Sequence, residues 1–254
     1  MEKFGVPLHP RLLRPFLRGN TCYICATGSS VRDIPSHILA DMRRNTTIGI
    51  NGWIRHHFVP DILVFEAIPD GSKREDIQFY CDAFIERQLD YSSVPIIMKD
   101  AETSAVPVPG FPQSLHQNLV RSTEYMLVAR TRGEVAGFFD YAKSCRRLYR
   151  DFENGLMPKR RGTAVYAIVL AYLLGFENVV MLGVDLDNGR HFYDADKTPA
   201  AADEPVHLCQ DDRIGLPISE VILGINDSLF EAENKSLSAF RPSVFFNGEI
   251  GAIV

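Results

Sequence analysis

The sequence has no uninterrupted run of about 18 apolar residues, the length that a helix needs to cross a membrane. Its longest apolar run, residues 164–174, has the length of a buried helix. The first 20 residues carry scattered charges and prolines in place of the apolar stretch of a secretory signal. These absences predict a soluble, cytoplasmic protein without a transmembrane segment, and they leave peripheral membrane contact open.

Cysteines are few, and their number, five, is odd. An odd count without a secretory signal does not suit a framework of disulfides. Cys22 and Cys25 form a C-x-x-C pair, but they fall within an expected strand, where residues three apart point to opposite faces. We therefore expect neither a redox centre nor a metal site at this pair.

Positive charge is also in deficit, because 27 Lys and Arg residues face 32 Asp and Glu residues, giving a net charge of −5. This balance gives the whole molecule no attraction to nucleic acid or an anionic membrane, and it leaves a local basic patch open. The hydrophobic share of 46% and charged share of 23% are those of a globular protein. With 254 residues and neither a repeat nor a clean linker, we expect one α/β domain over residues 1–254, with residues 1–20 as an N-terminal extension.

Short apolar segments alternate with segments of helical spacing. The expected strands are residues 21–26, 47–50, 62–65, 94–98, 179–184 and 244–246. The expected helices are residues 31–42, whole or broken near Pro35, 72–89 and 162–174. This alternation predicts a mostly parallel, Rossmann-like sheet with helices on both faces. Residues 99–132 contain three prolines and read as irregular, either a lid or binding segment or an ordinary surface excursion.

Parallel sheets bind ligands at the carboxyl ends of their strands, which directs attention to residues 27–30, Asn51, Glu66 and Asp185. In the first of these loops, Gly28 lets a ligand approach the backbone, and the amides of Ser29 and Ser30 favour an anion. The alternative is that one of the two serines is a helix N-cap. The loop matches neither the Walker pattern nor the dinucleotide fingerprint.

Charged residues elsewhere allow two interpretations each. Residues 159–161, Lys-Arg-Arg, precede the expected helix 162–174, where cations oppose the helix dipole, so they are either a solvated face or a site for phosphate. Asp185 and Asp187 could hold a metal if the strand continued, although the Asn-Gly that follows indicates a turn. His207 lies in a polar stretch and is either a surface residue or a proton acceptor near neutral pH.

Three segments, ICATGSSVRDIP, IGINGW and RRGTAVYAIVLAYLLGFENVVMLGVDL, together resemble the bacterial sialyltransferases of glycosyltransferase family 42. They are also similar to the MptE-like superfamily, which includes motility-accessory-factor glycosyltransferases and an archaeal pterin diphosphokinase. The resemblance implies a role in polysaccharide biosynthesis. It further implies transfer of a sugar from a nucleotide-sugar donor, CMP-linked before others, to the hydroxyl of a glycan acceptor.

The same resemblance implies roles for individual residues. The loop of Thr27, Gly28, Ser29 and Ser30 would face the nucleotide phosphate and ribose, and Asn51 would contact the donor. Arg160 and Thr163 match a pair that holds the donor, and Asp185 fits the aspartate of a G-I-D element. His207, with Asp212, resembles a general base in a mobile lid of about residues 187–215, and His191 is its rival.

One departure from the family leaves the chemistry open. Asp187 stands where the sialyltransferases have a tyrosine that neutralises the leaving phosphate, and only Phe192 and Tyr193 lie near the second such tyrosine. An acidic group there repels phosphate unless a cation intervenes. The alternatives to a cofactor-independent glycosyltransferase are an MptE-like diphosphokinase that uses ATP and Mg²⁺, and a nucleotide-binding module without chemistry. The sequence also leaves a homo-oligomer open.

Overall fold

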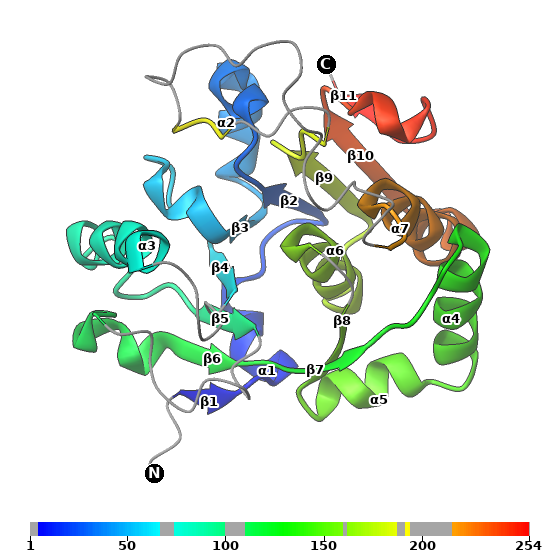
Figure 1. Cartoon of the computed structure of the whole chain (residues 1–254), viewed down its shortest axis with the longest axis horizontal. Coiled ribbons are helices and arrows are strands. Elements are labelled where there is room, and N and C mark those ends of the chain that lie inside the picture. Colours follow the sequence, from blue (N-terminus) through cyan, green and yellow to red (C-terminus); the bar gives the residue numbers. More distant parts are fainter. Residues whose placement is uncertain are drawn as a thin grey trace.

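A parallel sheet forms the centre of the molecule (Figure 1). The computed structural model describes residues 5–66, 74–99, 110–159, 162–186, 191–193 and 215–253. Within these residues the sheet has nine strands in the order β1-β6-β5-β4-β3-β2-β9-β10-β11, and every pairing is parallel. The strands are β1 (Val6–Pro7), β2 (Thr21–Cys25), β3 (Thr46–Ile50), β4 (Ile62–Glu66), β5 (Ile96–Lys99), β6 (Leu119–Arg121), β9 (Asn178–Leu182), β10 (Ser236–Phe240) and β11 (Gly251–Ile253).

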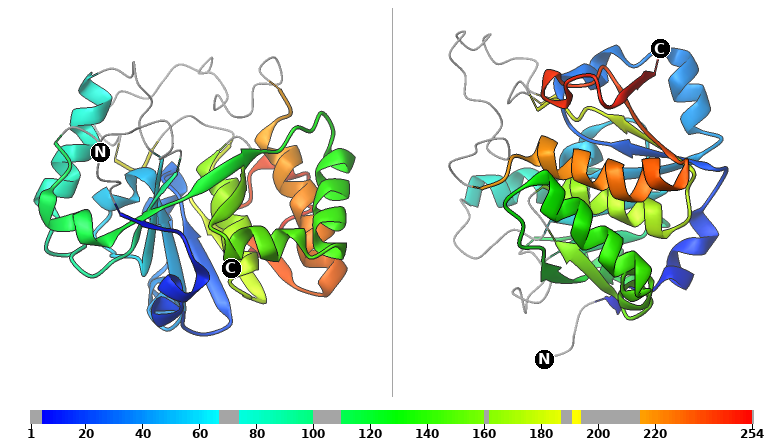
Figure 2. Two further views of the ribbon diagram at one scale, coloured as in Figure 1. Left: turned by 90° about the horizontal axis from the view of Figure 1, so that it is seen from below. Right: turned by 90° about the vertical axis from the view of Figure 1, so that its right-hand side faces the viewer.

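Helices cover both faces of this sheet. They are α1 (Pro10–Leu13), α2 (Ser36–Met42), α3 (Arg74–Glu86), α4 (Arg132–Ser144), α5 (Arg147–Glu153), α6 (Thr163–Leu173) and α7 (Ile218–Ile225). Helix α3 lies on one side, and α6, α7 and α4 lie on the other, with the short pair β7 (Thr123–Met126) and β8 (Leu156–Lys159) beside α6 (Figure 2). The predicted fold class, a mostly parallel α/β sheet with helices around it, is therefore confirmed.

The strands alternate between the two faces, as buried strands of a parallel sheet do. In β2, Cys22 and Ile24 pack into the cluster around α6, whereas Tyr23 and Cys25 pack against α2. The two cysteines of the C-x-x-C pair thus point to opposite faces, as expected. Burial raises the pKa of both thiols well above the usual range, which keeps them protonated and unreactive.

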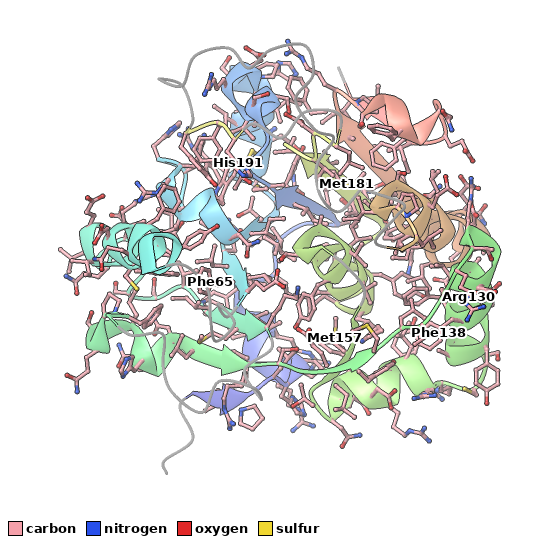
Figure 3. The ribbon with its side chains drawn as sticks, in the orientation of Figure 1. Phe65, Arg130, Phe138, Met157, Met181 and His191 are labelled. Carbon is pink, nitrogen blue, oxygen red and sulfur yellow. The ribbon has the colours of Figure 1, made fainter. Side chains whose placement is uncertain are left out.

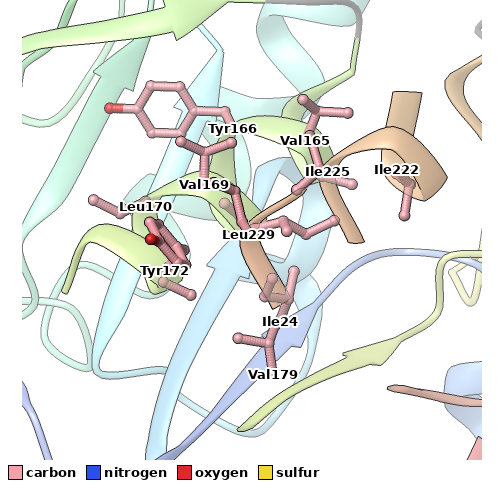
Figure 4. Packing of buried hydrophobic residues seen from close by; sticks show 14 of the residues in the cluster. Ile24, Val165, Tyr166, Val169, Leu170, Tyr172, Val179, Ile222, Ile225 and Leu229 are labelled. Carbon is pink, nitrogen blue, oxygen red and sulfur yellow. The ribbon is translucent and has the colours of Figure 1, made fainter. Parts of the chain in front are cut away.

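Helix α6 is buried on all sides, because it lies between the sheet and α7. Every residue from Thr163 to Leu173 is buried. Figure 4 shows Val165, Val169 and Ile24 among the side chains packed there. A helix without a polar face suits such a position. It ends where Gly175 takes a left-handed conformation with φ of 92°, the C-cap that the sequence predicts.

Two expectations for the secondary structure need correction. Residues 244–246 form a 3-10 helix, not the last strand, and the strands of this region are β10 and β11. Polar serines in β10 and the brevity of β11 hide both from an apolar pattern. The irregular stretch 99–132 contains a 3-10 helix, Gln113–Asn118, followed by β6 and β7. Of the two forms expected for residues 31–42, the structure has the broken one, with a 3-10 helix, Ser29–Asp33, before Pro35 and α2 after it.

The direction of the chain changes at the centre of the sheet. From β2 the chain proceeds through β3, β4, β5 and β6 on one side, and it returns to place β9 on the other side of β2. This is the topological switch point at which open α/β sheets bind ligands. None of the described helices is long and apolar enough to span a lipid bilayer.

Candidate functional site

A cavity of about 240 Å³ lies at the carboxyl ends of β2, β3, β4 and β9. Its polar and glycine lining comes from segments that are distant in the sequence. These residues are Thr27, Gly28, Asn51, Glu66, Tyr80, Gly162, Thr163, Gly183, Asp185, His191 and Tyr193. The structure therefore brings together Thr27, Gly28, Asn51, Thr163 and Asp185, five of the predicted site residues.

The loop after β2 is fastened to the loop after β9 by Asp185. Its Oδ2 accepts the backbone N–H of Ser30 at 2.7 Å, and its Oδ1 accepts the Ser30 hydroxyl at 2.6 Å. The Ser29 hydroxyl donates to Oδ2 at 3.4 Å. The predicted anion at the Ser30 amide is thus the protein's own carboxylate, and neither serine lines the cavity.

Gly28 permits this contact, because a Cβ there would lie 2.4 Å from Cγ of Asp185. The residue is also the N-cap of the 3-10 helix Ser29–Asp33, and it has no side chain that could accept a hydrogen bond. The alternative prediction, that Ser29 or Ser30 is the N-cap, is therefore wrong. The register of β2 and β9 explains the arrangement, since Cys25 pairs with Leu182 and the loops that follow lie side by side.

Asn51, Glu66 and Thr163 form a hydrogen-bonded triangle on the opposite wall. Asn51 has a positive φ of 46°, and its Oδ1 accepts the backbone N–H of Glu66 at 3.0 Å. The Asn51 Nδ2 donates to Oγ1 of Thr163 at 3.2 Å. The Thr163 hydroxyl in turn donates to Oε2 of Glu66 at 2.8 Å. Thr163 thus binds the Glu66 carboxylate directly, whereas Asn51 binds the Glu66 backbone and the Thr163 hydroxyl.

Lys99, at the end of β5, lies next to this triangle, and it was not among the residues predicted for the site. Its side chain is 1% exposed, and its Nζ lies 3.7 Å from Oε2 of Glu66 and 3.5 Å from Oγ1 of Thr163. The Tyr166 ring lies 5.6 Å away. A buried ammonium needs such partners. Its position in the sequence could have identified it, because Lys99 ends an apolar strand at the same edge of the sheet as the predicted site residues.

The N-terminus of α6 opens into the cavity. Its N-cap, Gly162, has φ of 84° and makes no side-chain cap, and Gly162, Thr163 and Ala164 all line the cavity. The first turn of a helix has N–H groups without helical partners and a partial positive charge, which together favour an anion. Arg160, predicted to bind the donor here, lies outside the described residues.

His191 is the histidine that the described part of the chain places in the cavity (Figure 3). Its Nδ1 lies 2.9 Å from the Thr27 hydroxyl, and the segment is tied to β2 by the bond from the Phe192 N–H to the Thr27 carbonyl, 2.8 Å long. The predicted base His207 and its partner Asp212 lie outside the described residues. Most of the predicted lid, residues 187–215, lies outside them too.

Tyr193 continues this segment along the cavity wall. Its ring stacks on His191 with centroids 5.0 Å apart and leaves no room for a side chain at Gly52, where a Cβ would lie 2.8 Å from the Tyr193 hydroxyl. Phe192 packs edge-on against Trp53 and His56. These contacts fix residues 191–193 on the segment that follows β3.

Of the two aspartates that could form a metal pair, the structure describes only Asp185. Both oxygens of Asp185 are engaged by serines, and Asp187 lies outside the described residues. Among the residues that the structure describes, no three His, Cys, Asp or Glu side chains gather as they would around a metal ion.

Two solved structures are similar to the chain. The alpha-2,3-sialyltransferase Cst-I from Campylobacter jejuni matches with a TM-score of 0.47 and 14% identity, over 92% of this chain and 80% of that one. A mutant of the alpha-2,3/8-sialyltransferase CstII matches with a TM-score of 0.45 and 10% identity, over 91% of this chain and 86% of that one. No protein-family model and no curated protein matches the sequence.

Both structures are sialyltransferases, the class that the three sequence segments resemble, and both are similar to this chain at low identity. Similarity at this level assigns neither a substrate nor a residue, so the function has to follow from the chemistry of the site.

Proposed function

We propose that the protein is a glycosyltransferase that moves a sugar from a nucleotide-sugar donor, CMP-linked before others, to a hydroxyl of a glycan. The observation that carries the proposal is the N-terminus of α6, which opens without a side-chain cap into a cavity that also contains a histidine. Such a transfer needs a site for the leaving phosphate and a proton acceptor for the attacking hydroxyl.

The leaving phosphate binds at the first turn of α6 in this proposal. Thr163 and Ala164 line the cavity, and a phosphate there would face the positive end of the helix dipole. Arg160, two residues before Gly162 in the chain, supplies positive charge, and the Tyr193 hydroxyl supplies a further donor. Thr27 and Gly28 face the ligand, whereas Ser29 and Ser30 act indirectly by holding Asp185.

The proton acceptor is a histidine. The Thr27 contact favours His191, because a hydrogen bond at Nδ1 fixes the orientation of the ring beside the cavity. The alternative is His207 with Asp212, on a lid of about residues 187–215 that would close over the donor and exclude water. In both versions the protein is one domain that acts in the cytoplasm on a glycan of polysaccharide biosynthesis.

A thermal-shift screen of CMP, UDP, GDP and ATP, each with and without Mg²⁺, tests this proposal. We expect stabilisation by one of the first three nucleotides without a requirement for Mg²⁺, because bound ligand stabilises the folded state by mass action. Stabilisation by ATP alone, and only with Mg²⁺, would indicate the diphosphokinase instead. Binding without transfer to any glycan would indicate a nucleotide-binding module.

A further inference from the structure

Arg32 lies in the 3-10 helix Ser29–Asp33, and its guanidinium binds the main chain that carries His191. Its Nε donates to the Phe192 carbonyl at 2.9 Å, and its Nη2 donates to the His191 carbonyl at 3.4 Å. Two successive carbonyls are therefore bound by one side chain. A guanidinium suits this arrangement, because its N–H groups lie in one plane at a fixed spacing.

The loop after β2 binds the same segment through other groups. The Phe192 N–H donates to the Thr27 carbonyl at 2.8 Å, and Gly28 pairs with His191 as an isolated antiparallel bridge. The main-chain N–H and C=O of Phe192 are thus both bound, the first by Thr27 and the second by Arg32. Together these bonds fix the backbone from which the His191 ring extends.

The 3-10 helix that carries Arg32 is itself anchored near both ends. At its start, the hydroxyl of Ser30 donates to Asp185. At its end, Asp33 forms an ion pair with Arg241, which follows β10. The helix therefore connects the loops that follow β2, β9 and β10, and Arg32 joins the His191 segment to this fixed framework.

The orientation of the His191 ring decides whether it can act as a base. In the tautomer whose Nδ1 carries the proton, Nδ1 donates to the Thr27 hydroxyl, 2.9 Å away, and Nε2 remains as the proton acceptor. This bond requires that the backbone of His191 stays in place, because a shift of about 1 Å breaks a hydrogen bond and can lower a catalytic rate about 10²-fold.

We infer that Arg32 is a positioning residue: by binding the carbonyls of His191 and Phe192, it holds the His191 ring against Thr27 and leaves Nε2 to the attacking hydroxyl. Among the described residues, those that line the cavity do not include Arg32, so it acts through His191. This inference rests on the proposed function, because it concerns the histidine base of the same site.

The experiment compares R32A, R32K and the control R241A with the wild type. Arg241 is an exposed arginine that binds the same 3-10 helix, at Asp33 and not at the His191 segment. The first readout is a proton–nitrogen correlation spectrum of the imidazole rings at about pH 8, above the ordinary histidine pKa of about 6.5. Both ring nitrogens give signals that report the tautomer, and the signals of His191 are those that H191Q loses.

The second readout is the pair of kcat and KM for sugar transfer, with melting temperatures to verify folding. We expect the wild type and R241A to show His191 in one tautomer, with Nδ1 protonated, and R32A to show exchange between both tautomers. R32A should lower kcat about tenfold at an unchanged KM. R32K, which keeps a charged donor, should restore kcat to within about threefold of the wild type.

An unchanged His191 spectrum in R32A, or an unchanged kcat in R32A despite a changed spectrum, overturns the inference while the proposed function stands. An equal effect of R241A on the spectrum overturns it too, since the effect would then belong to the whole 3-10 helix. If the wild type transfers no sugar from any nucleotide-sugar, the proposed function fails, and the spectra alone decide whether Arg32 holds the ring.

Discussion

Asp185 and Ser30 are separated by 155 residues in the sequence and are joined by two hydrogen bonds, from the Ser30 amide and from the Ser30 hydroxyl. The pair connects the loops that follow β2 and β9, at the topological switch point of the sheet. Its carboxylate occupies the place where the sequence predicted a ligand anion. The consequence is that Asp185 belongs to the framework of the cavity.

Replacement of Asp185 by Asn should destabilise the protein by about 1.5–3 kcal/mol, the range for hydrogen bonds to a charged group. Ser30→Ala should cost less, because the backbone amide of residue 30 still donates to Asp185. Urea unfolding of the wild type, both single variants and the double variant measures the coupling, which we expect to exceed about 0.5 kcal/mol. Strictly additive effects would contradict the direct contact.

The two candidate bases can be separated by their alanine variants. Replacing the histidine that acts as the base should lower turnover by about 10²–10⁴-fold, while donor binding stays nearly unchanged. We expect this result for His191→Ala, because Thr27 orients that ring in the cavity. Thr27→Val should reproduce part of the loss. Normal turnover in His191→Ala together with a loss in His207→Ala would assign the base to His207.

Arg160 provides a test of the phosphate site that does not depend on the base. Arg160→Ala should weaken nucleotide binding by about 1.5–3 kcal/mol, since a hydrogen bond from a guanidinium to a phosphate has that magnitude. Calorimetry with the bare nucleotide measures it, and Arg150→Ala on α5 is the matched control. An unchanged affinity in Arg160→Ala removes this residue from the site.

His56 predicts a pH dependence of stability. Burial, followed by the positive charges of His57 and Arg87, lowers the pKa of His56 to about 4. The unfolded chain, in which the pKa is about 6.5, binds more protons between these values, so folding stability is complete above pH 6.5 and falls as the pH decreases toward 4. We expect a contribution of about 1–2 kcal/mol across this window. Thermal unfolding of His56→Gln should show a smaller decrease over that window, and an equal decrease would contradict the assignment.

Much of the framework is readable from the sequence because buried parallel strands are nearly all apolar. The ends of β2, β3, β4, β5 and β9, and those of α6, were predicted to within two residues. The strands β10 and β11 were not, because Ser236 and Ser238 interrupt the apolar pattern and register with β9 decides the pairing. Propensity alone carries no information on such a neighbour.

Several residues at the strand ends line one cavity, as their positions predicted, yet their contacts were not predictable. The contact of Asp185 with Ser30 depends on which strand lies beside β2, and the sequence does not state the strand order. Lys99 was missed for a related reason, since a charged residue after an apolar strand normally reaches solvent. Only the packing of α6 over the sheet buries it beside Glu66.

The central claim, that a nucleotide phosphate binds at the first turn of α6, is tested most directly by Ala164→Asp. Ala164 lines the cavity in that turn, where an acidic side chain suits the helix dipole but repels phosphate. With Ala164→Ser as control and melting temperatures to verify folding, we predict that calorimetry finds nucleotide binding at least about tenfold weaker in Ala164→Asp. Equal affinity in a folded Ala164→Asp would contradict the account.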